Sequence, residues 1–235
     1  YTHKAISKWL VVSEIIVKKI FSASKESFNL TTEKLFVFGH GIKTNDRLEY
    51  NDNLKQIVTL GRVAKVKKID TLIKAIKILN DNGFEVNYDI IGPCLCDADK
   101  KYFDELKKLV NDNNLNERIR FLPAISYQSI ERVLQRYSIF IHQCQGGLDK
   151  APLEAMAFGL LVFSSNKSVA DNLRMIDDLF VFAEDDECEL ADKIKQLFLT
   201  DENKIVDYRK KMKEQIKNNH SLERLISKIV DEIVS

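Results

Sequence analysis

Residues 56–92 read QIVTLGRVAKVKKIDTLIKAIKILNDNGFEVNYDIIG, and this stretch decides the fold of the chain. Its two short β-rich runs, 56–60 and 86–91, predict strands. Between them, apolar residues recur at helical spacing until Asn82-Gly83 ends the pattern; they are Ile69, Leu72, Ile73, Ile76 and Leu79. A strand, an amphipathic helix and a second strand form a crossover unit, in which the two strands run in parallel.

The same alternation continues over most of the chain. Further strands are predicted at 119–122, 139–142, 161–164 and 179–182. Further helices are predicted at 100–111, 129–135, 151–158 and 187–199, followed by two terminal helices at 205–218 and 222–234. Repeated crossovers of this length predict an α/β fold, a Rossmann-like open parallel sheet flanked by helices.

The N-terminal segment does not fit this repeating unit. Residues 5–12 predict a strand, Ser13 can cap a helix that continues through Ser22, and residues 35–38 predict another strand. Such a piece is typical of the end of a preceding domain, with residues 40–53 as the connection. Because the first residue is Tyr1 rather than a methionine, we expect the sequence to be a piece of a longer protein.

Composition bounds the class of function. A formal net charge of +1 gives no global field that would attract nucleic acid. The four cysteines lack the spacing of a zinc site or a disulfide framework, and we interpret them as reduced cytosolic thiols; they are Cys94, Cys96, Cys144 and Cys188. No apolar run approaches the roughly 20 residues that span a bilayer. The lysines of the terminal helices indicate a solvated face, with a basic face against a membrane surface as the alternative.

Three segments directly follow predicted strands, and ligands of doubly wound sheets bind at the carboxyl ends of the strands. In the first segment, Gly61 to Lys68, Arg62 and Lys67 could neutralise a diphosphate; the alternative is a solvated basic loop. In the second segment, Gly92 permits the close approach of a ligand, and a plain turn fits equally well.

The third segment, residues 146–159, reads GGLDKAPLEAMAFG. Its two glycines let the backbone approach a ligand closely, and Pro152 suits the first turn of a helix whose free N–H groups attract anions. We place Glu154 in that first turn, where its carboxylate could accept hydrogen bonds from the hydroxyls of a ribose. The alternative is a buried turn before a core helix, with Glu154 as a partner of the helix dipole.

Taken together, these residues resemble a known family. The resemblance is carried, in order, by Gly61-Arg62 with Lys67, by Asp89-Ile90-Ile91-Gly92, by Phe121-Leu122-Pro123 with Tyr137, and by Leu153-Glu154-Ala155-Met156-Ala157-Phe158-Gly159. This combination resembles the C-terminal domain of the retaining GT-B glycosyltransferases known as glycosyl transferases group 1. The match spans residues 57 to about 182, and Leu-Glu-Ala-Met-Ala is its specific element.

The resemblance implies a donor site for a nucleotide sugar, with UDP-sugar as the expected substrate and no metal required. Arg62 and Lys67 match the pair that contacts the donor diphosphate, and Glu154 matches the glutamate that holds the ribose. These three are the expected catalytic residues. The remaining donor-binding residues that it implies are Gly61, Gly92, Gly146, Gly147, Leu148, Asp149 and Lys150.

The resemblance also implies how the chain is divided. Residues 1–42 match the end of an N-terminal domain and its linker, residues 43–218 form the nucleotide-sugar-binding domain, and residues 219–235 form a C-terminal helix. Because the family binds the acceptor in the N-terminal domain, we expect this piece alone to be inactive. A glycan or a lipid-linked acceptor is expected, in the cytoplasm or at the inner face of the membrane.

One position departs from the family. The family has a second glutamate eight positions before Glu154, and this chain has Gly146 there. Either Asp149 or Gln145 makes a different contact with the sugar, or the donor is recognised differently. A non-catalytic nucleotide-sugar-binding domain is therefore the alternative function.

Two further classes are disfavoured by the sequence. A Rossmann-type oxidoreductase is disfavoured because no strand is followed by Gly-x-Gly-x-x-Gly with a ribose-binding acid at the usual spacing. His40 and His142 have no carboxylate or second histidine at ligand spacing, so we assign no metal site to them.

Overall fold

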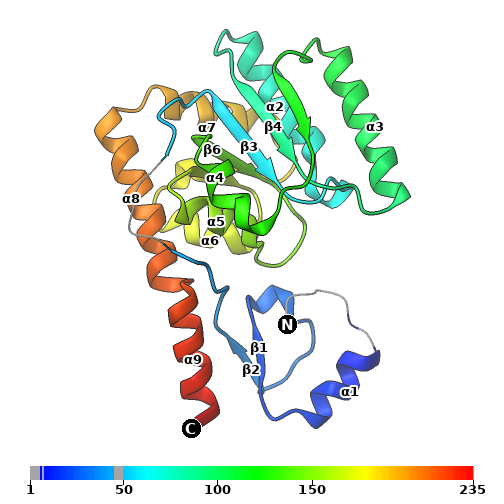
Figure 1. Ribbon diagram of the computed structural model, residues 1–235, viewed down its shortest axis with the longest axis vertical. Coiled ribbons are helices and arrows are strands. Elements are labelled where there is room, and N and C mark those ends of the chain that lie inside the picture. The colour runs from blue at the N-terminus through cyan, green and yellow to red at the C-terminus, as the bar shows by residue number, and fades with distance from the viewer. Residues whose placement is uncertain (1–5, 7, 45–49, 235) are drawn as a thin grey trace.

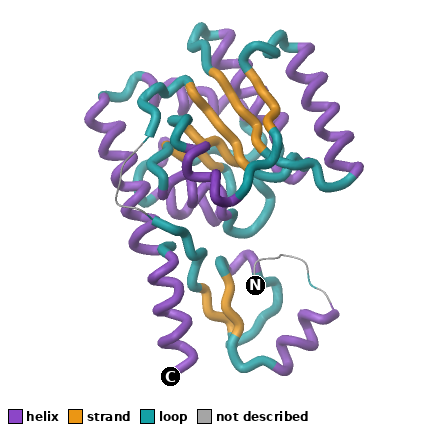
Figure 2. Tube along the Cα trace, viewed as in Figure 1, coloured by secondary structure: helices purple, strands orange, loops and turns teal. Residues whose placement is uncertain are grey.

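The computed structural model describes residues 6, 8–44 and 50–234, and most of them form an open five-stranded sheet with helices around it (Figures 1 and 2). The strand order is β5-β4-β3-β6-β7, and every neighbouring pair is parallel. The strands are β3 (Gln56–Leu60), β4 (Asn87–Ile91), β5 (Ile119–Leu122), β6 (Ile139–His142) and β7 (Leu161–Ser164). The predicted α/β fold class is confirmed.

Helices connect these strands and cover the sheet. They are α2 (Ile69–Asp81), α3 (Asp97–Asp112), α4 (Ile130–Leu134), α5 (Lys150–Ala157), α6 (Lys167–Arg174), α7 (Glu187–Phe198) and α8 (Glu202–Asn219). Helix α2 packs against α7, and α5 packs against α8. Strands β6 and β7 are buried along their whole length, because helices leave neither face of the central sheet to solvent.

The end of the sheet differs from the prediction. Residues 179–182 form no full strand, because a short 3-10 helix, Asp178–Phe180, leaves only an isolated bridge between Val181 and Ser164. Helix α6 precedes this segment and was not predicted. It has only eight residues, of which Val169, Ala170 and Leu173 supply the buried apolar side chains.

The N-terminal segment also differs from the prediction. Residues 8–12 of the predicted strand 5–12 are helical, since they belong to α1 (Lys8–Ile16), while residues 5 and 7 lie outside the described residues. The predicted helix 13–22 ends at Ile16, and its last residues instead form β1 (Ile20–Ser22). Strand β1 pairs in parallel with β2 (Leu35–Val37), which lies within the predicted strand 35–38.

The C-terminal helices link this small N-terminal unit to the main sheet. Helices α8 and α9 (Leu222–Val234) run along one side of the molecule, from the main body toward β1 and β2 (Figure 1). At the junction, the backbone N–H of Ile42 donates to the carbonyl oxygen of His220 at 2.8 Å. Among the described residues, no helix combines the length and the apolar character needed to cross a membrane.

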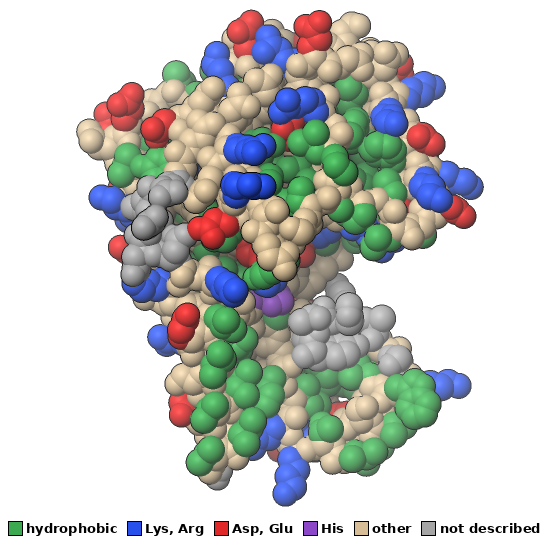
Figure 3. All heavy atoms as spheres, in the orientation of Figure 1, with side chains coloured by type: hydrophobic (Ala, Val, Ile, Leu, Met, Phe, Trp, Pro, Cys, Tyr) green, Lys and Arg blue, Asp and Glu red, His purple; other side chains and the backbone are tan. Residues whose placement is uncertain are grey.

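On the face shown in Figure 3, basic and acidic side chains are interspersed over the main body. Hydrophobic side chains gather instead over the lower part, where α1 and α9 expose large apolar residues; these include Trp9, Ile15, Ile16, Ile226, Val230 and Ile233. The division of the chain at residues 42 and 218 stays a prediction.

Candidate functional site

The site lies where the order in which strands are added to the sheet reverses. From β3 the chain proceeds to β4 on one side, whereas β6 pairs with β3 on the other side. The carboxyl ends of β3 and β6 therefore flank a topological switch point, which is the place where doubly wound sheets bind ligands. The loop after β3 carries Lys67, and the loop after β6 carries Asp149.

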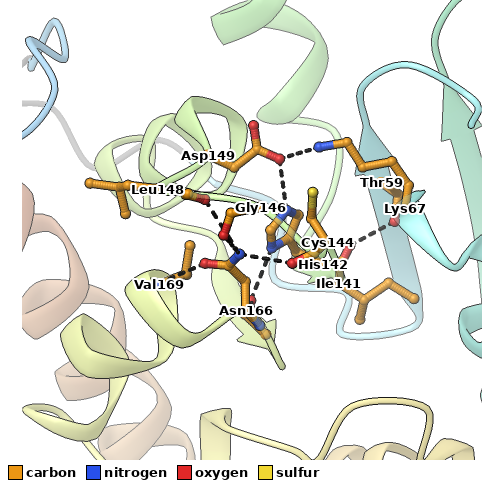
Figure 4. A network of polar contacts seen from close by, with 12 residues as sticks. Thr59, Lys67, Ile141, His142, Cys144, Gly146, Leu148, Asp149, Asn166 and Val169 are labelled. Atoms are coloured by element: carbon orange, nitrogen blue, oxygen red, sulfur yellow. Dashed lines mark hydrogen bonds and ion pairs between the residues drawn. The ribbon is translucent and has the colours of Figure 1, made fainter. Parts of the chain in front are cut away.

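Lys67 and Asp149 meet across this switch point. The ammonium of Lys67 donates to Asp149 Oδ2, although 82 residues separate the two (Figure 4). The side chain of Lys67 is only 17% exposed. Burial lowers its pKa and the Asp149 carboxylate raises it, with a net upward shift, so Lys67 stays charged.

Local backbone geometry brings Lys67 to this position. Residues Lys65–Lys67 form a single 3-10 turn, and Lys68 then adopts the left-handed conformation at φ 47° before α2 begins. The two loops also share a backbone hydrogen bond, from the N–H of Gln145 to the carbonyl oxygen of Val66 at 3.3 Å. The two predicted segments are thus one structural unit.

Asp149 has a second partner at the end of β6. His142 Nε2 lies 3.0 Å from Asp149 Oδ2, and His142 Nδ1 lies 2.9 Å from the hydroxyl of Ser164 on β7. Burial lowers the pKa of His142, so the imidazole is neutral. The seven-residue interval between His142 and Asp149 is not a ligand spacing in the sequence. The two side chains meet because the loop after β6 folds back onto the strand.

Asn166 holds this loop in place. Its side-chain Nδ2 donates to the carbonyl oxygens of Cys144 at 2.8 Å, Gly146 at 3.0 Å and Gly147 at 3.4 Å (Figure 4). Its Oδ1 accepts from the N–H of Val169 and caps α6. Asn166 was not among the predicted site residues, because α6 was not predicted. An asparagine before a helix is nevertheless a common N-cap signal.

Glu154 lies in α5, as expected, but in the second turn of this helix and not in the first. Helix α5 begins at Lys150, so Pro152 is its third residue and Glu154 lies in the second turn. The carboxylate is almost fully buried and pairs with the ammonium of Lys150 at 3.3 Å. Burial raises the pKa of Glu154. Glu154 and Tyr127 line a pocket of about 140 Å³.

Arg62 is turned toward α3. Its Nε and Nη2 donate to the two carboxylate oxygens of Asp99 at 2.6 and 2.9 Å, and Nη2 also lies 3.3 Å from the thiol of Cys96. This fork holds the pKa of Asp99 at about 2. Among the contacts that the structure describes, Arg62 joins none of the other predicted site residues. The predicted pair is thus divided, because Arg62 binds Asp99 and Lys67 binds Asp149.

Two glycines bring the loops after β3 and β4 together. The N–H of Gly61 donates to the carbonyl oxygen of Ile91 at 2.9 Å. A Cβ atom on Gly92 would lie 1.7 Å from the carbonyl oxygen of Gly61, so the position excludes every side chain. Beside Gly92 lies an apolar pocket of about 140 Å³ that is also lined by Val63, Phe121 and other residues of these loops.

Two of the remaining predicted residues, Gly147 and Leu148, contact the N-terminal segment. A Cβ atom on Gly147 would lie 2.1 Å from the hydroxyl oxygen of Ser27. The carbonyl oxygen of Leu148 lies 2.9 Å from His40 Nε2. Gly147 and Leu148 are therefore packed between the main sheet and the N-terminal unit. A Cβ atom on Gly146 would meet only the thiol of Cys144, at 3.4 Å.

Comparison with known proteins agrees with this architecture. The sequence model of the family described as glycosyl transferases group 1 matches residues 43–219. A search among curated protein sequences gives no match.

Several solved structures share the fold. A TarM variant from S. aureus, in complex with fondaparinux, alpha-GlcNAc-glycerol and UDP, is 18% identical over 95% of this chain and 45% of its own, with a TM-score of 0.76. Anabaena HepE, in complex with UDP and glucose, is 17% identical over 93% of this chain and 63% of its own, with a TM-score of 0.78. The pneumococcal O-GlcNAc transferase GtfA, in complex with UDP and GlcNAc, is 17% identical over 97% of this chain and 47% of its own, with a TM-score of 0.75.

This chain thus spans from just under half to less than two thirds of the length of these proteins. The family model covers most of the chain, and the strand order places its residues on the expected sheet. On these grounds the chain belongs to the glycosyl transferases group 1 family and has the fold of a GT-B glycosyltransferase domain.

Proposed function

We propose that this chain is the donor-binding part of a retaining glycosyltransferase of the hexosyltransferase type. It binds a UDP-sugar and passes the sugar to a glycan or a lipid-linked acceptor. The observation that carries the proposal is the meeting of Lys67 with the glycine turn and Asp149 at the switch point between β3 and β6. The complexes of HepE and GtfA with UDP and a sugar support the choice of donor.

Each charged residue has a separate task in this proposal. Lys67 and Arg62 offset the negative charge that grows on the diphosphate when the bond between the sugar and the β-phosphate breaks. The carboxylate of Glu154 accepts hydrogen bonds from the ribose hydroxyls. Because two cationic side chains and the backbone amides of the turn supply the positive charge, no metal ion is required.

The acceptor side is assigned to a preceding domain. The acceptor oxygen attacks the anomeric carbon on the face that the diphosphate leaves, so the configuration is retained. In this proposal the piece alone does not transfer sugar, and the whole protein works in the cytoplasm. Contact with the inner face of a membrane would fall to the exposed apolar residues of α9, such as Ile226 and Val230. Nucleic acid is not among the expected partners.

Calorimetry with UDP, GDP and ADP tests donor binding on the chain as it stands. Replacing Glu154→Ala removes charge-assisted hydrogen bonds, each of which contributes about 1.5–3 kcal/mol, so we expect UDP binding to weaken about tenfold or more. Arg62→Ala should also weaken binding. Arg118→Ala is the matched control, because Arg118 pairs with Glu85 beside the amino end of β5, at the opposite edge of the sheet.

Equal binding of UDP by the two site variants and the control would refute the site assignment. Turnover by the full-length protein separates a transferase from a non-catalytic binding domain. The anomeric configuration of the product, followed by NMR, then tests retention. Binding without turnover in the full-length protein would favour the non-catalytic alternative.

A further inference from the structure

Three potential metal ligands converge at the end of β6. They are the imidazole of His142, the thiol of Cys144 and the carboxylate of Asp149, and their ligand atoms all lie within 4.8 Å of one another. His142 is buried, whereas Cys144 and Asp149 are partly exposed. Figure 4 shows the three side chains directed toward a common point beside the ammonium of Lys67.

A positive charge already occupies this point. The Lys67 ammonium binds Asp149 Oδ2 and also lies beside the Cys144 thiol. At least two of the three side chains, those of Cys144 and Asp149, therefore already face a cation. An ammonium carries a single charge and interacts only weakly with sulfur. A soft divalent ion would carry two charges and bind the nitrogen, sulfur and oxygen atoms directly.

The surrounding contacts fix two of the ligands before any ion binds. The hydroxyl of Ser164 lies 2.9 Å from His142 Nδ1 and sets the ring so that Nε2 faces Asp149. Asn166 holds the carbonyl oxygen of Cys144 at 2.8 Å and thereby the backbone that carries the thiol. Such outer contacts orient metal ligands and strengthen their binding.

We propose that His142, Cys144 and Asp149 form a binding site for Zn²⁺, in which the ion takes the place of the Lys67 ammonium. Zinc bonds of about 2.0–2.3 Å put tetrahedral ligand atoms roughly 3–4 Å apart, so small rotations of Cys144 and Asp149 close the site. Three protein ligands leave the fourth position to water. Mg²⁺ is excluded by the donor set, because it requires oxygen ligands in octahedral geometry.

Zinc binding is measured on the whole chain, without nucleotide, by competition with a fluorescent chelator. We expect one zinc ion per chain and no competition by Mg²⁺. Cys144→Ser and Asp149→Asn should each weaken binding by about tenfold or more. Lys67→Met should tighten binding, because it removes the competing charge. Cys188→Ser is the control, since Cys188 is exposed on α7, and it should change nothing.

Substitution with Co²⁺ provides a second readout that does not depend on a variant. Thiolate ligation gives a charge-transfer band in the near ultraviolet, and this band should disappear in Cys144→Ser. The inference is overturned if the wild-type chain binds no zinc at micromolar concentrations, or if zinc affinity is the same in Cys144→Ser as in Cys188→Ser. Zinc binding is measured without nucleotide, so failure here leaves the donor assignment intact.

Discussion

Replacing Gly92 by alanine tests whether the two loops after β3 and β4 must touch. The new Cβ would lie 1.7 Å from the carbonyl oxygen of Gly61 and 2.6 Å from its carbonyl carbon, whereas ordinary contact begins at 3.4 Å. Because both atoms belong to the backbone, no side-chain rotation relieves the clash. The loops must separate by about 1.7 Å, the difference between these distances, which breaks the hydrogen bond between Gly61 and Ile91.

The expected loss of stability combines two effects. Overpacking costs about 1–3 kcal/mol and the lost hydrogen bond about 1 kcal/mol, so we expect the free energy of unfolding to fall by about 3 kcal/mol. For a domain of this size that lowers Tm by roughly 6–12 °C. Thermal unfolding followed by circular dichroism measures the change.

Gly146→Ala is the matched control for this experiment. Its Cβ would meet only the Cys144 thiol, at the ordinary distance of 3.4 Å, so its Tm should stay close to that of the wild type. The reasoning is refuted if Gly92→Ala melts at the same temperature as Gly146→Ala. That outcome would mean that the loops after β3 and β4 separate without cost.

Two further predictions concern stability. Arg209 is 1% exposed and donates to the carbonyl oxygen of Gly159 at 2.5 Å and to Ser138 Oγ at 3.2 Å. Arg209→Met leaves these buried acceptors unpaired, so the free energy of unfolding, measured with urea, should fall by about 3 kcal/mol. Burial, with His40 nearby, lowers the pKa of His220 to about 4 from 6.5. The unfolded chain therefore binds a proton that the folded chain excludes, and stability should fall by about 2 kcal/mol from pH 7 to pH 5. A urea midpoint that does not change over this pH range, or that changes equally in His220→Asn, would contradict the assignment to His220.

The parallel sheet could be predicted because its strands are apolar on both faces. The predicted bounds of the strands at 56–60 and 161–164 agree with β3 and β7 residue by residue. Such runs need helices on both sides, and the helical spacing of the intervening segments supplies them. Because the segments with Lys67 and the glycine turn each follow a predicted strand, the order of elements also placed them at one edge of the sheet.

Short apolar runs rich in β-branched residues were the main source of error. Residues 8–12 contain Trp9, Val11 and Val12, a composition typical of a strand, yet they form α1. Periodicity cannot separate a short strand from a short helix in such a run. Val11 and Val12 are exposed, so no packing against a sheet selects the extended form.

Two of the charge pairs within the site, those of Arg62 and of Lys67, could not be read from the sequence. Arg62 and Asp99 are 37 residues apart, and Lys67 and Asp149 are 82 residues apart. Neither pair has a helical or strand spacing, so only the folded chain brings them together. The same holds for Asn166, whose contacts with the glycine turn cross from α6 to the loop after β6.

These partners change what donor binding must accomplish. In the structure, Asp149 pairs with Lys67, Asp99 pairs with Arg62, and Lys150 pairs with Glu154. Under the proposed function, a diphosphate gains Lys67 only by displacing the Asp149 carboxylate. The free energy that Lys67 contributes to donor binding is therefore the difference between its ion pair with the diphosphate and its ion pair with Asp149. Donor affinity should then depend on what stabilises Asp149 after the exchange.

His142 is the neighbour positioned to stabilise it. Its Nε2 lies 3.0 Å from the same carboxylate oxygen that Lys67 contacts, and Ser164 fixes the ring from the other side. If Lys67 leaves, the hydrogen bond from His142 would keep the partly buried carboxylate of Asp149 from standing unpaired.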